Sequence, residues 1–428
     1  MSEKYHDPAE YIRGIQQILV SDKKRIGFLF GAGSSLAQKK GKTSLTVPAI
    51  GKMTTDIVDE ISAKKAEHKK ALEEIKVELD NAYNIETILS NLEQKSKLLS
   101  GVNKLNGLSE SDFLELIKLV KECVRKKVSV HKDSTGAPVS LETIDDLVQT
   151  DFANWIGQAE RKFPIEIFTT NYDFLFELGL EQKEIPYYDG FCGSYRPFFN
   201  SESVENLSFL SNQTKVWKIH GSLGWHYDDK TEKILRKNPD DEDILIYPSS
   251  LKYKDSKKQP YESLMDRLSN FIKQDDTILI TCGYSWGDEH INERIISALK
   301  TNTSSHVIGL IFDKYKDAAG DIKYLLNEDT SLSKVGLNNP KISLYGYRHA
   351  IIGCKKRQWK LKSEPDIDDT VQVNMYYDED APEIDQDTGD PIWTGLGEFI
   401  LPDFSRLVNF LDQMIADNEI KTIGKDAK

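Results

Sequence analysis

Three short segments of the chain join an apolar run to a polar turn whose side chains could do chemistry. They read Ile-Gly-Phe-Leu-Phe-Gly-Ala-Gly-Ser-Ser at 26–35, Ile-Phe-Thr-Thr-Asn-Tyr-Asp at 167–173 and Val-Trp-Lys-Ile-His-Gly-Ser at 216–222. Open α/β sheets place their functional groups at the carboxyl ends of parallel strands. We therefore expect an amide, a carboxylate and an imidazole to meet beside a glycine-rich turn at one edge of a sheet.

The amide, the carboxylate and the imidazole belong to Asn171, Asp173 and His220. An imidazole titrates near neutral pH, so His220 can accept a proton from water or from a ribose hydroxyl. Asn171 would orient that hydroxyl or water, and Asp173 would hold a carboxamide. The alternative interpretation is structural: Asn171 and Asp173 cap a helix, and the histidine is tied to the backbone of a turn.

The glycine turn Gly31-Ala32-Gly33, followed by Ser34, is the candidate phosphate site. Glycine lets a backbone approach a pyrophosphate closely. The third glycine of the usual dinucleotide fingerprint is missing, because position 36 is Leu. A tight strand-to-helix turn is therefore the alternative, and it is the three segments together that predict a dinucleotide site.

Five more residues are candidates for contact with a dinucleotide. Gly283 and Ser285 follow another strong apolar run and would contact the adenosine half, with Asn292 one turn into the next helix. Thr170 stands in the turn before the candidate amide. Glu86 lies on a helical stretch, where it faces either the ribose or, as most helix glutamates do, solvent.

The composition limits the classes of function. The chain has 428 residues and a formal net charge of −13, which argues against a protein that coats nucleic acid by itself, because phosphate neutralisation needs a basic face. No window resembles a signal peptide or an apolar span of about 20 residues, so we expect a cytoplasmic protein without membrane contact. The cysteines form no Cys-x-x-Cys pair, so neither zinc nor a disulfide is expected for Cys123, Cys192, Cys282 and Cys354.

The hydrophobic pattern predicts how the polar segments are connected. Asp7-Pro8 opens a first helix before a strand at 25–30, a loop at 31–47 lies over the ligand, and residues 48–160 are helical almost throughout. Strand and helix patterns alternate after that, which predicts a parallel sheet with helices on both faces. Strands are expected at 165–170, 215–219, 243–247, 276–282, 305–312 and 341–346, and helices at 259–274, 288–299, 316–327 and around 402–417.

This pattern predicts an α/β fold in three parts. Residues 1–47 and 161–350 form a Rossmann-like, doubly wound parallel sheet. Residues 48–160 form a helical insertion, and residues 351–428 form an irregular C-terminal extension. Within the extension, the acid-rich segment 364–390 is either a solvated irregular segment or a β-hairpin that contacts a partner, and its composition favours the solvated irregular segment.

With these residues in view, the chain resembles the sirtuin superfamily. Gly-Ala-Gly-Ser-Ser at 31–35 is similar to the nucleotide loop of that family, and Thr-Asn-Tyr-Asp at 170–173 is similar to its Gln-Asn-Ile-Asp motif. Ile-His-Gly-Ser at 219–222 is similar to its catalytic histidine segment. The two zinc-binding cysteine pairs and the Pro-Asp-Phe-Arg segment of sirtuin deacylases are missing, so the resemblance does not extend to acyl-lysine recognition.

The pattern is closer to bacterial sirtuin-like NAD-cleaving proteins of anti-phage systems. Their Phe-Thr-Thr-Asn-Tyr-Asp and Lys-Ile-His-Gly-Ser-Leu motifs are similar to residues 168–173 and 218–223. A Tyr-Pro followed by Lys-Tyr is matched here by Tyr247-Pro248 and Lys252-Tyr253.

The resemblance implies an NAD⁺ glycohydrolase that uses no metal and releases nicotinamide and ADP-ribose. It also implies a homo-oligomer whose activity depends on a HerA-type ATPase or a phage-derived activator. Two other classes stay open. One is a non-catalytic sensor of NAD or ADP-ribose, which would not need His220, and the other is a nuclease subunit working with a HerA-type ATPase.

Overall fold

The structure is a computed structural model, and most of the candidate residues named above follow strands of its central sheet. Within the described residues this sheet has nine strands in the order β17-β16-β15-β12-β11-β1-β2-β6-β3. The described residues are 5–21, 23–42, 45–99, 103–133, 135–159, 161–228, 230–237, 244–246, 260–365 and 373–414. The strands of the sheet are β1 (Arg25–Phe30), β2 (Glu166–Thr169), β3 (Tyr187–Tyr188), β6 (Thr214–Lys218), β11 (Thr277–Cys282), β12 (His306–Leu310), β15 (Ile342–Tyr345), β16 (His349–Ile352) and β17 (Lys355–Gln358).

The strand order is that of a doubly wound sheet. Strands β1, β2, β6, β11, β12 and β15 pair in parallel, and β16 and β17 add an antiparallel edge. Numbered along the chain, these six strands follow the order 3-2-1-4-5-6, which is the Rossmann order. The two-residue strand β3 also pairs in parallel, with β6 at the edge of the sheet. The order reverses between β1 and β11, and this switch point is where such sheets bind ligands. The predicted Rossmann-like α/β fold is confirmed.

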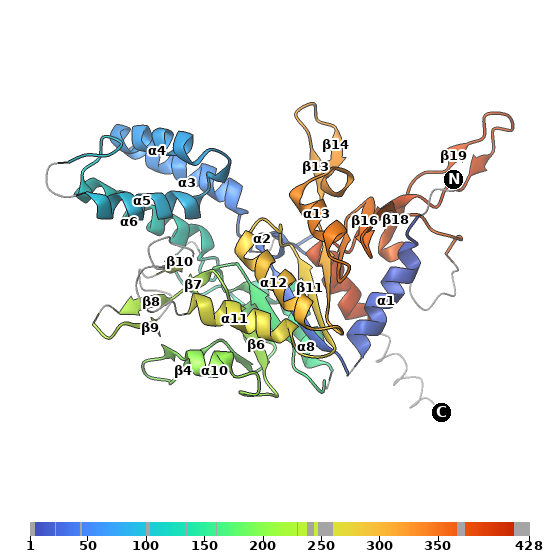
Figure 1. Cartoon of the computed structure of the whole chain (residues 1–428), viewed down its shortest axis with the longest axis horizontal. Helices are drawn as coiled ribbons and strands as arrows, with labels where there is room; N and C mark the ends of the chain where they lie inside the picture. Colours follow the sequence, from blue (N-terminus) through green and yellow to red (C-terminus); the bar gives the residue numbers. More distant parts are fainter. Residues whose placement is uncertain are drawn as a thin grey trace.

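Helices cover both faces of the sheet, as Figure 1 shows. Helices α1 (Pro8–Val20), α8 (Val148–Gly157) and α9 (Leu175–Gln182) share one apolar core with the helix at 404–414. Helices α11 (Tyr261–Ile272), α12 (Glu289–Thr301) and α13 (Ser331–Asn338) belong to the core on the other face. Strand β1 serves both cores, because Phe28 and Phe30 face the first and Leu29 faces the second. A strand buried on both faces reads as a continuous apolar run, which is why the sequence revealed it.

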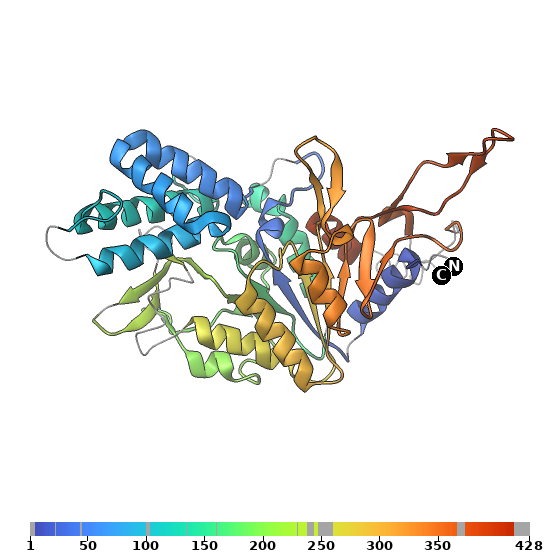
Figure 2. The same cartoon turned by 45° about the horizontal axis from the view of Figure 1, so that its top comes forward.

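A separate layer of helices stands at one end of the molecule in Figures 1 and 2. It has its own apolar core, which also receives Tyr172, Leu175 and Leu223 from the body. Ser109 and Asp112 form a capping box at its last long helix. The division of the chain at 48 and 160 stays a prediction. The helices of this part are α3 (Ile50–Lys64), α4 (Ala66–Leu79), η1 (Asp80–Ala82), α5 (Ile85–Leu98), α6 (Glu110–Val128) and α7 (Leu141–Asp145).

Short strands from segments before and after His220 form two small sheets. Strand β7 (Gly221–Leu223) pairs with β10 (Ile244–Ile246), so the strand expected at 243–247 is present in part. A second sheet has the order β4-β5-β9-β8. Its strands and the adjoining helix are β4 (Phe191–Cys192), β5 (Phe198–Phe199), α10 (Ser201–Glu205), β8 (Trp225–Asp228) and β9 (Lys233–Arg236).

The helix predicted at 316–327 is wrong. This segment is a hairpin of β13 (Lys314–Lys316) and β14 (Ile322–Tyr324), followed by a 3₁₀ turn, η2 (Leu325–Asn327). Asp317 accepts hydrogen bonds from the amides of Ala319 and Asp321, and Gly320 has a φ of +89°, so the segment turns sharply instead of continuing as a helix. The helix comes later, as α13.

The acid-rich segment forms β-structure, so the expected irregular conformation of 364–390 is wrong for its described part, although the hairpin residues are exposed to solvent. Strand β18 (Tyr377–Glu379) pairs with β21 (Gly397–Phe399), next to a 3₁₀ turn η3 (Val373–Met375). Beyond it, β19 (Glu383–Ile384) and β20 (Pro391–Ile392) form a hairpin that extends away from the body in both views. Composition alone missed it because the pairing depends on the turn at Asp385, which accepts from the amides of Asp387 and Thr388.

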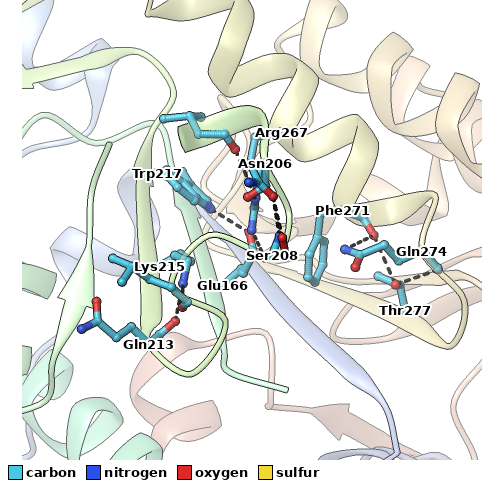
Figure 3. A network of polar contacts seen from close by, with 12 residues as sticks. Glu166, Asn206, Ser208, Gln213, Lys215, Trp217, Arg267, Phe271, Gln274 and Thr277 are labelled. Carbon is cyan, nitrogen blue, oxygen red and sulfur yellow. Dashed lines mark hydrogen bonds and ion pairs between the residues drawn. The ribbon is translucent and has the colours of Figure 1, made fainter. Parts of the chain in front are cut away.

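A buried polar network closes the amino edge of the sheet (Figure 3). The carboxylate of Glu166, the first residue of β2, accepts two hydrogen bonds from Arg267 on α11 and one from the indole of Trp217. Arg267 also donates to the carbonyls of Val204 and Asn206, so its guanidinium is well satisfied inside the protein.

In the part of the chain that the structure describes, no helix is both long and apolar enough to cross a membrane.

Candidate functional site

The carboxyl edge of the sheet brings the predicted amide and carboxylate together with the glycine turn. Asn171 is buried, and its Nδ2 lies 3.0 Å from the carbonyl of Gly31, 3.1 Å from Ser34 Oγ and 2.7 Å from Ser35 Oγ. Ser35 Oγ in turn donates to Asp173 Oδ2 at 2.8 Å. The turns after β1 and β2 are therefore joined by side-chain hydrogen bonds.

Glycines let the turns after β1 and β11 touch at the switch point. A Cβ at Gly33 would lie 2.6 Å from the Cα of Gly283, and a Cβ at Gly283 would lie 2.5 Å from the amide nitrogen of Ser34. Gly283 also has a φ of +64°, a conformation that side chains disfavour. The close approach that these glycines allow is thus between two loops of the protein itself.

The backbone amides proposed for phosphate already have partners. Gly31 N donates to the Cys282 carbonyl at 3.4 Å, Gly33 N to the Gly283 carbonyl at 3.0 Å and Ser34 N to the Gly31 carbonyl at 2.9 Å. Residues Ala32–Leu36 form the one-turn helix α2. Contact of these amides with a phosphate would therefore exchange an internal hydrogen bond for one to the ligand.

Asp173 is fixed from several sides. Its Oδ1 accepts from the amide of Leu175, the first residue of α9, at 3.1 Å, although the N-cap of that helix is Phe174. The ammonium of Lys218 donates to the carbonyl of Asp173 and lies 3.0 Å from Glu177 Oε1. Lys218 is buried, and burial raises the pKa of Glu177 although the lysine opposes that shift. This pair holds the turn after β2 against the strand that leads to His220.

His220 lies between two carboxylates from distant parts of the chain. Its Nε2 is 2.9 Å from Asp288 Oδ2, and its Nδ1 is 3.8 Å from Glu86 Oε1. Asp288 is the N-cap of α12, whereas Glu86 is in the first turn of α5 in the helical layer. The hydroxyl of Tyr172 donates to the same Glu86 oxygen.

The two carboxylates set the charge of the imidazole. Burial lowers the pKa of His220, but the hydrogen bond to Asp288 and the charge of Glu86 outweigh it, so the pKa is raised. Burial raises the pKa of Asp288, and the contact with His220 outweighs that effect, so this pKa is lowered. The raised pKa of His220 and the lowered pKa of Asp288 both favour an ion pair between the imidazolium and the carboxylate.

The remaining predicted residues lie around these groups. Thr170 N donates to the Phe30 carbonyl at 3.1 Å, and Ser285 is exposed, with its hydroxyl accepting from the amide of Gly287. Asn292 is engaged in the loop after β11, where its Nδ2 donates to the Trp286 carbonyl and its Oδ1 accepts from Tyr284. The motif residues Tyr247-Pro248 and Lys252-Tyr253 lie outside the described residues.

Asp288 is the residue that sequence reasoning missed. It stands in the segment that contains Gly283 and Ser285, and in the structure it is also the N-cap of α12. Its contact with His220 joins residues 68 positions apart, and no local pattern reports such a pair. Among the described residues no group of three His, Cys, Asp or Glu side chains is arranged to hold a metal, and the four cysteines are free thiols.

The fold and the site define the class of protein. A doubly wound sheet with a glycine turn, an amide and a histidine at its switch-point edge belongs to the nucleotide-binding α/β proteins. Residues 165–330 match the family described as SIR2-like domain, and this match supports an NAD-related function. The match confirms the sirtuin-like resemblance. The matched range includes Asn171, His220 and Asp288, whereas Gly31 and Glu86 lie before its first residue.

No curated protein matches the chain.

Proposed function

We propose that the protein is an NAD⁺ glycohydrolase that cleaves the bond between nicotinamide and ribose. The observation that carries the proposal is the position of His220, held between Asp288 and Glu86 in a SIR2-like domain. Asn171 at the neighbouring turn supplies the amide that such a site needs. A buried histidine with two carboxylate partners is suited to taking up a proton.

The reaction is a substitution at the anomeric carbon of the nicotinamide-bearing ribose. The carbon–nitrogen bond breaks, and its electron pair leaves with nicotinamide. Water attacks the oxocarbenium-like ribose and loses a proton to His220, which gives ADP-ribose. General base catalysis of this kind contributes about 10²–10⁴-fold to the rate. The carboxylates of Asp288 and Glu86 would stabilise the imidazolium that forms.

The binding roles follow the arrangement of the turns. Asn171 would orient water or the ribose, and Asp173 would hold the carboxamide of nicotinamide. The glycine turn at 31–34 with Thr170 would lie along the pyrophosphate, and Gly283, Ser285 and Asn292 along the adenosine half. Because Asn171 and Asp173 are already hydrogen bonded inside the protein, substrate binding would exchange some of these contacts.

The biological role that we propose is depletion of NAD⁺ during anti-phage defence in the cytoplasm. Its support is the similarity of residues 168–173 and 218–223 to the motifs of bacterial sirtuin-like defence proteins. Because loss of NAD⁺ is toxic, the enzyme would have low resting activity and would be activated as a homo-oligomer, by a HerA-type ATPase or by a phage-derived activator.

The test is to incubate the purified protein with NAD⁺, alone and with a HerA-type ATPase, and to quantify nicotinamide and ADP-ribose. We expect release that His220→Ala and Asn171→Ala abolish. The matched control is His306→Ala, which removes a largely buried histidine whose Nε2 contacts Ser343 in the sheet. Bound NAD⁺ without release would favour the sensor, and magnesium-dependent DNA cleavage that survives Asn171→Ala would favour the nuclease subunit.

A further inference from the structure

The two ring nitrogens of His220 have unequal surroundings. Nε2 is at hydrogen-bond distance from Asp288, whereas Nδ1 is 3.8 Å from Glu86, which is longer than a hydrogen bond. An ionised carboxylate only accepts hydrogen bonds, so the contact with Asp288 requires the proton on Nε2. In the neutral ring Nδ1 then carries the lone pair.

Asp288 is held in place independently of the histidine. Its second oxygen, Oδ1, accepts from the amide of Ile291 at 3.1 Å as the N-cap of α12. The loop before it is fixed by Trp286, which has a φ of +58° and whose buried indole donates to Thr281 Oγ1. A carboxylate anchored to a helix end can impose one ring orientation on its histidine.

Glu86 reaches the same histidine from the helical layer. Its helix α5 begins with a capping box made by Asn84 and Thr87, and its Oε1 accepts from the hydroxyl of Tyr172. The charged and titratable groups that face the imidazole are therefore Asp288 from α12, Glu86 from α5 and, through Glu86, the neutral phenol of Tyr172.

We infer that Asp288 is a positioning residue that fixes the Nε2–H tautomer of His220, that Nδ1 is the atom that takes the proton, and that Glu86 stabilises the resulting charge. This inference rests on the proposed glycohydrolase function for the identity of the proton donor. The water molecule that attacks the anomeric carbon transfers its proton to Nδ1 while nicotinamide leaves with the electron pair of the broken bond. His220 thus becomes an imidazolium between two carboxylates, one from each side.

The test uses Asp288→Asn, because asparagine keeps an oxygen that can cap α12 but lacks the charge. Asp288→Ser is a second variant that also caps, and Glu86→Gln removes the other charge. The control is Asp7→Asn, which makes the same change at the N-cap of α1, where the aspartate accepts from Ala9. Circular dichroism and thermal melting establish that each variant is folded.

Two readouts separate positioning from a merely structural role. The first is the titration of the His220 imidazole by NMR, with its signal identified by its loss in His220→Gln. We expect the midpoint to fall by about 1 pH unit or more in Asp288→Asn, because an opposite charge at this distance favours the protonated ring. The second is NAD⁺ hydrolysis, for which we expect kcat to fall about 10- to 100-fold with a smaller change in KM. The acid limb of the pH–rate profile should move to lower pH.

An unchanged His220 titration in Asp288→Asn and Asp288→Ser would overturn the inference. So would a loss of activity without any movement of the acid limb, because that is what a purely structural role predicts. The titration needs no turnover, so it tests the positioning role of Asp288 separately from the proposed glycohydrolase function. A shifted midpoint in a protein that never hydrolyses NAD⁺ would contradict the proposed function. It would still support Asp288 as the group that sets the protonation state of His220.

Discussion

Arg267 and Glu166 form a two-point ion pair at the amino edge of the sheet, with Nη2···Oε1 at 2.6 Å and Nε···Oε2 at 2.9 Å. Arg267 is 1% exposed. Glu166 is the first residue of β2, so the pair lies at the opposite end of that strand from the turn that carries Asn171.

Arg267→Met is expected to lower the free energy of unfolding by about 3–5 kcal/mol, because it leaves the carboxylate of Glu166 buried without its cation. Denaturant unfolding measures the loss. Adding Glu166→Gln to the same chain should recover part of it, since the uncompensated charge is then gone. A loss below about 1 kcal/mol for Arg267→Met would show that water or another group satisfies the carboxylate.

Gly283→Ala is expected to destabilise the protein and to disturb the switch point. The new methyl group would meet the amide of Ser34, and alanine disfavours the positive φ of this position. The cost should exceed 1 kcal/mol. Gly51→Ala is the matched control, because a Cβ there meets nothing within 4 Å and the residue lies in α3. That control should stabilise by roughly 0.4–1 kcal/mol. Equal melting temperatures for the two variants would contradict the packing argument.

Asn171→Asp should be more harmful than its small change in shape suggests. The amide Nδ2 faces the carbonyl of Gly31, and a carboxylate oxygen in its place would set one acceptor against another. We expect a loss of about 1–3 kcal/mol in the free energy of unfolding. Asn171→Ala, which removes the group without adding charge, should cost less. The prediction fails if the aspartate variant is the more stable of the two at neutral pH.

The pair of His220 and Asp288 should make stability depend on pH. The pKa of His220 is raised above its ordinary 6.5, so its contribution is complete below that pH and is lost as pH rises through the folded-state pKa. The pKa of Asp288 is lowered from 3.8, so its contribution is present above that value and is lost as pH falls. The difference in unfolding free energy between the wild type and Asp288→Asn should therefore be larger at about pH 5 than at about pH 9. Equal differences at the two pH values would show that the pair is not charged.

The sheet was predictable because its parallel strands are buried on both faces. Strands β1 and β11 are mostly apolar, β2 and β6 have a short apolar centre, and each is followed by a polar turn, so both the strands and the edge with the site could be inferred. The hairpin at 314–324 was missed because its exposed strands are short. Its turn is set by Asp317 and Gly320, residue types that also occur at the ends of helices.

The site was predictable only in part, because its geometry depends on contacts between distant residues. The types of Asn171, Asp173 and His220 and the strands before them were enough to bring them to one edge. The second carboxylate of the site, Asp288, and the orientation of Glu86 depend on how α12 and the helical layer pack against that edge. The glycines were interpreted as points where the backbone approaches a pyrophosphate, and that contact stays a prediction. In the structure the backbone that Gly33 approaches closely is that of Gly283.

One hydrogen bond of the turn after β1 has a consequence for the architecture of the whole chain. The side-chain amide of Gln149, at the start of α8, donates to the carbonyl of Ser34 at 2.7 Å, and Lys39 lies 2.8 Å from Asp151. The helices α3–α6 therefore leave and rejoin the body at nearly the same place, inside the crossover from β1 to β2. Closing so long a loop costs chain entropy that grows only slowly with length. The crossover can thus be lengthened, shortened or exchanged for another module, while the strand order of the sheet stays the same.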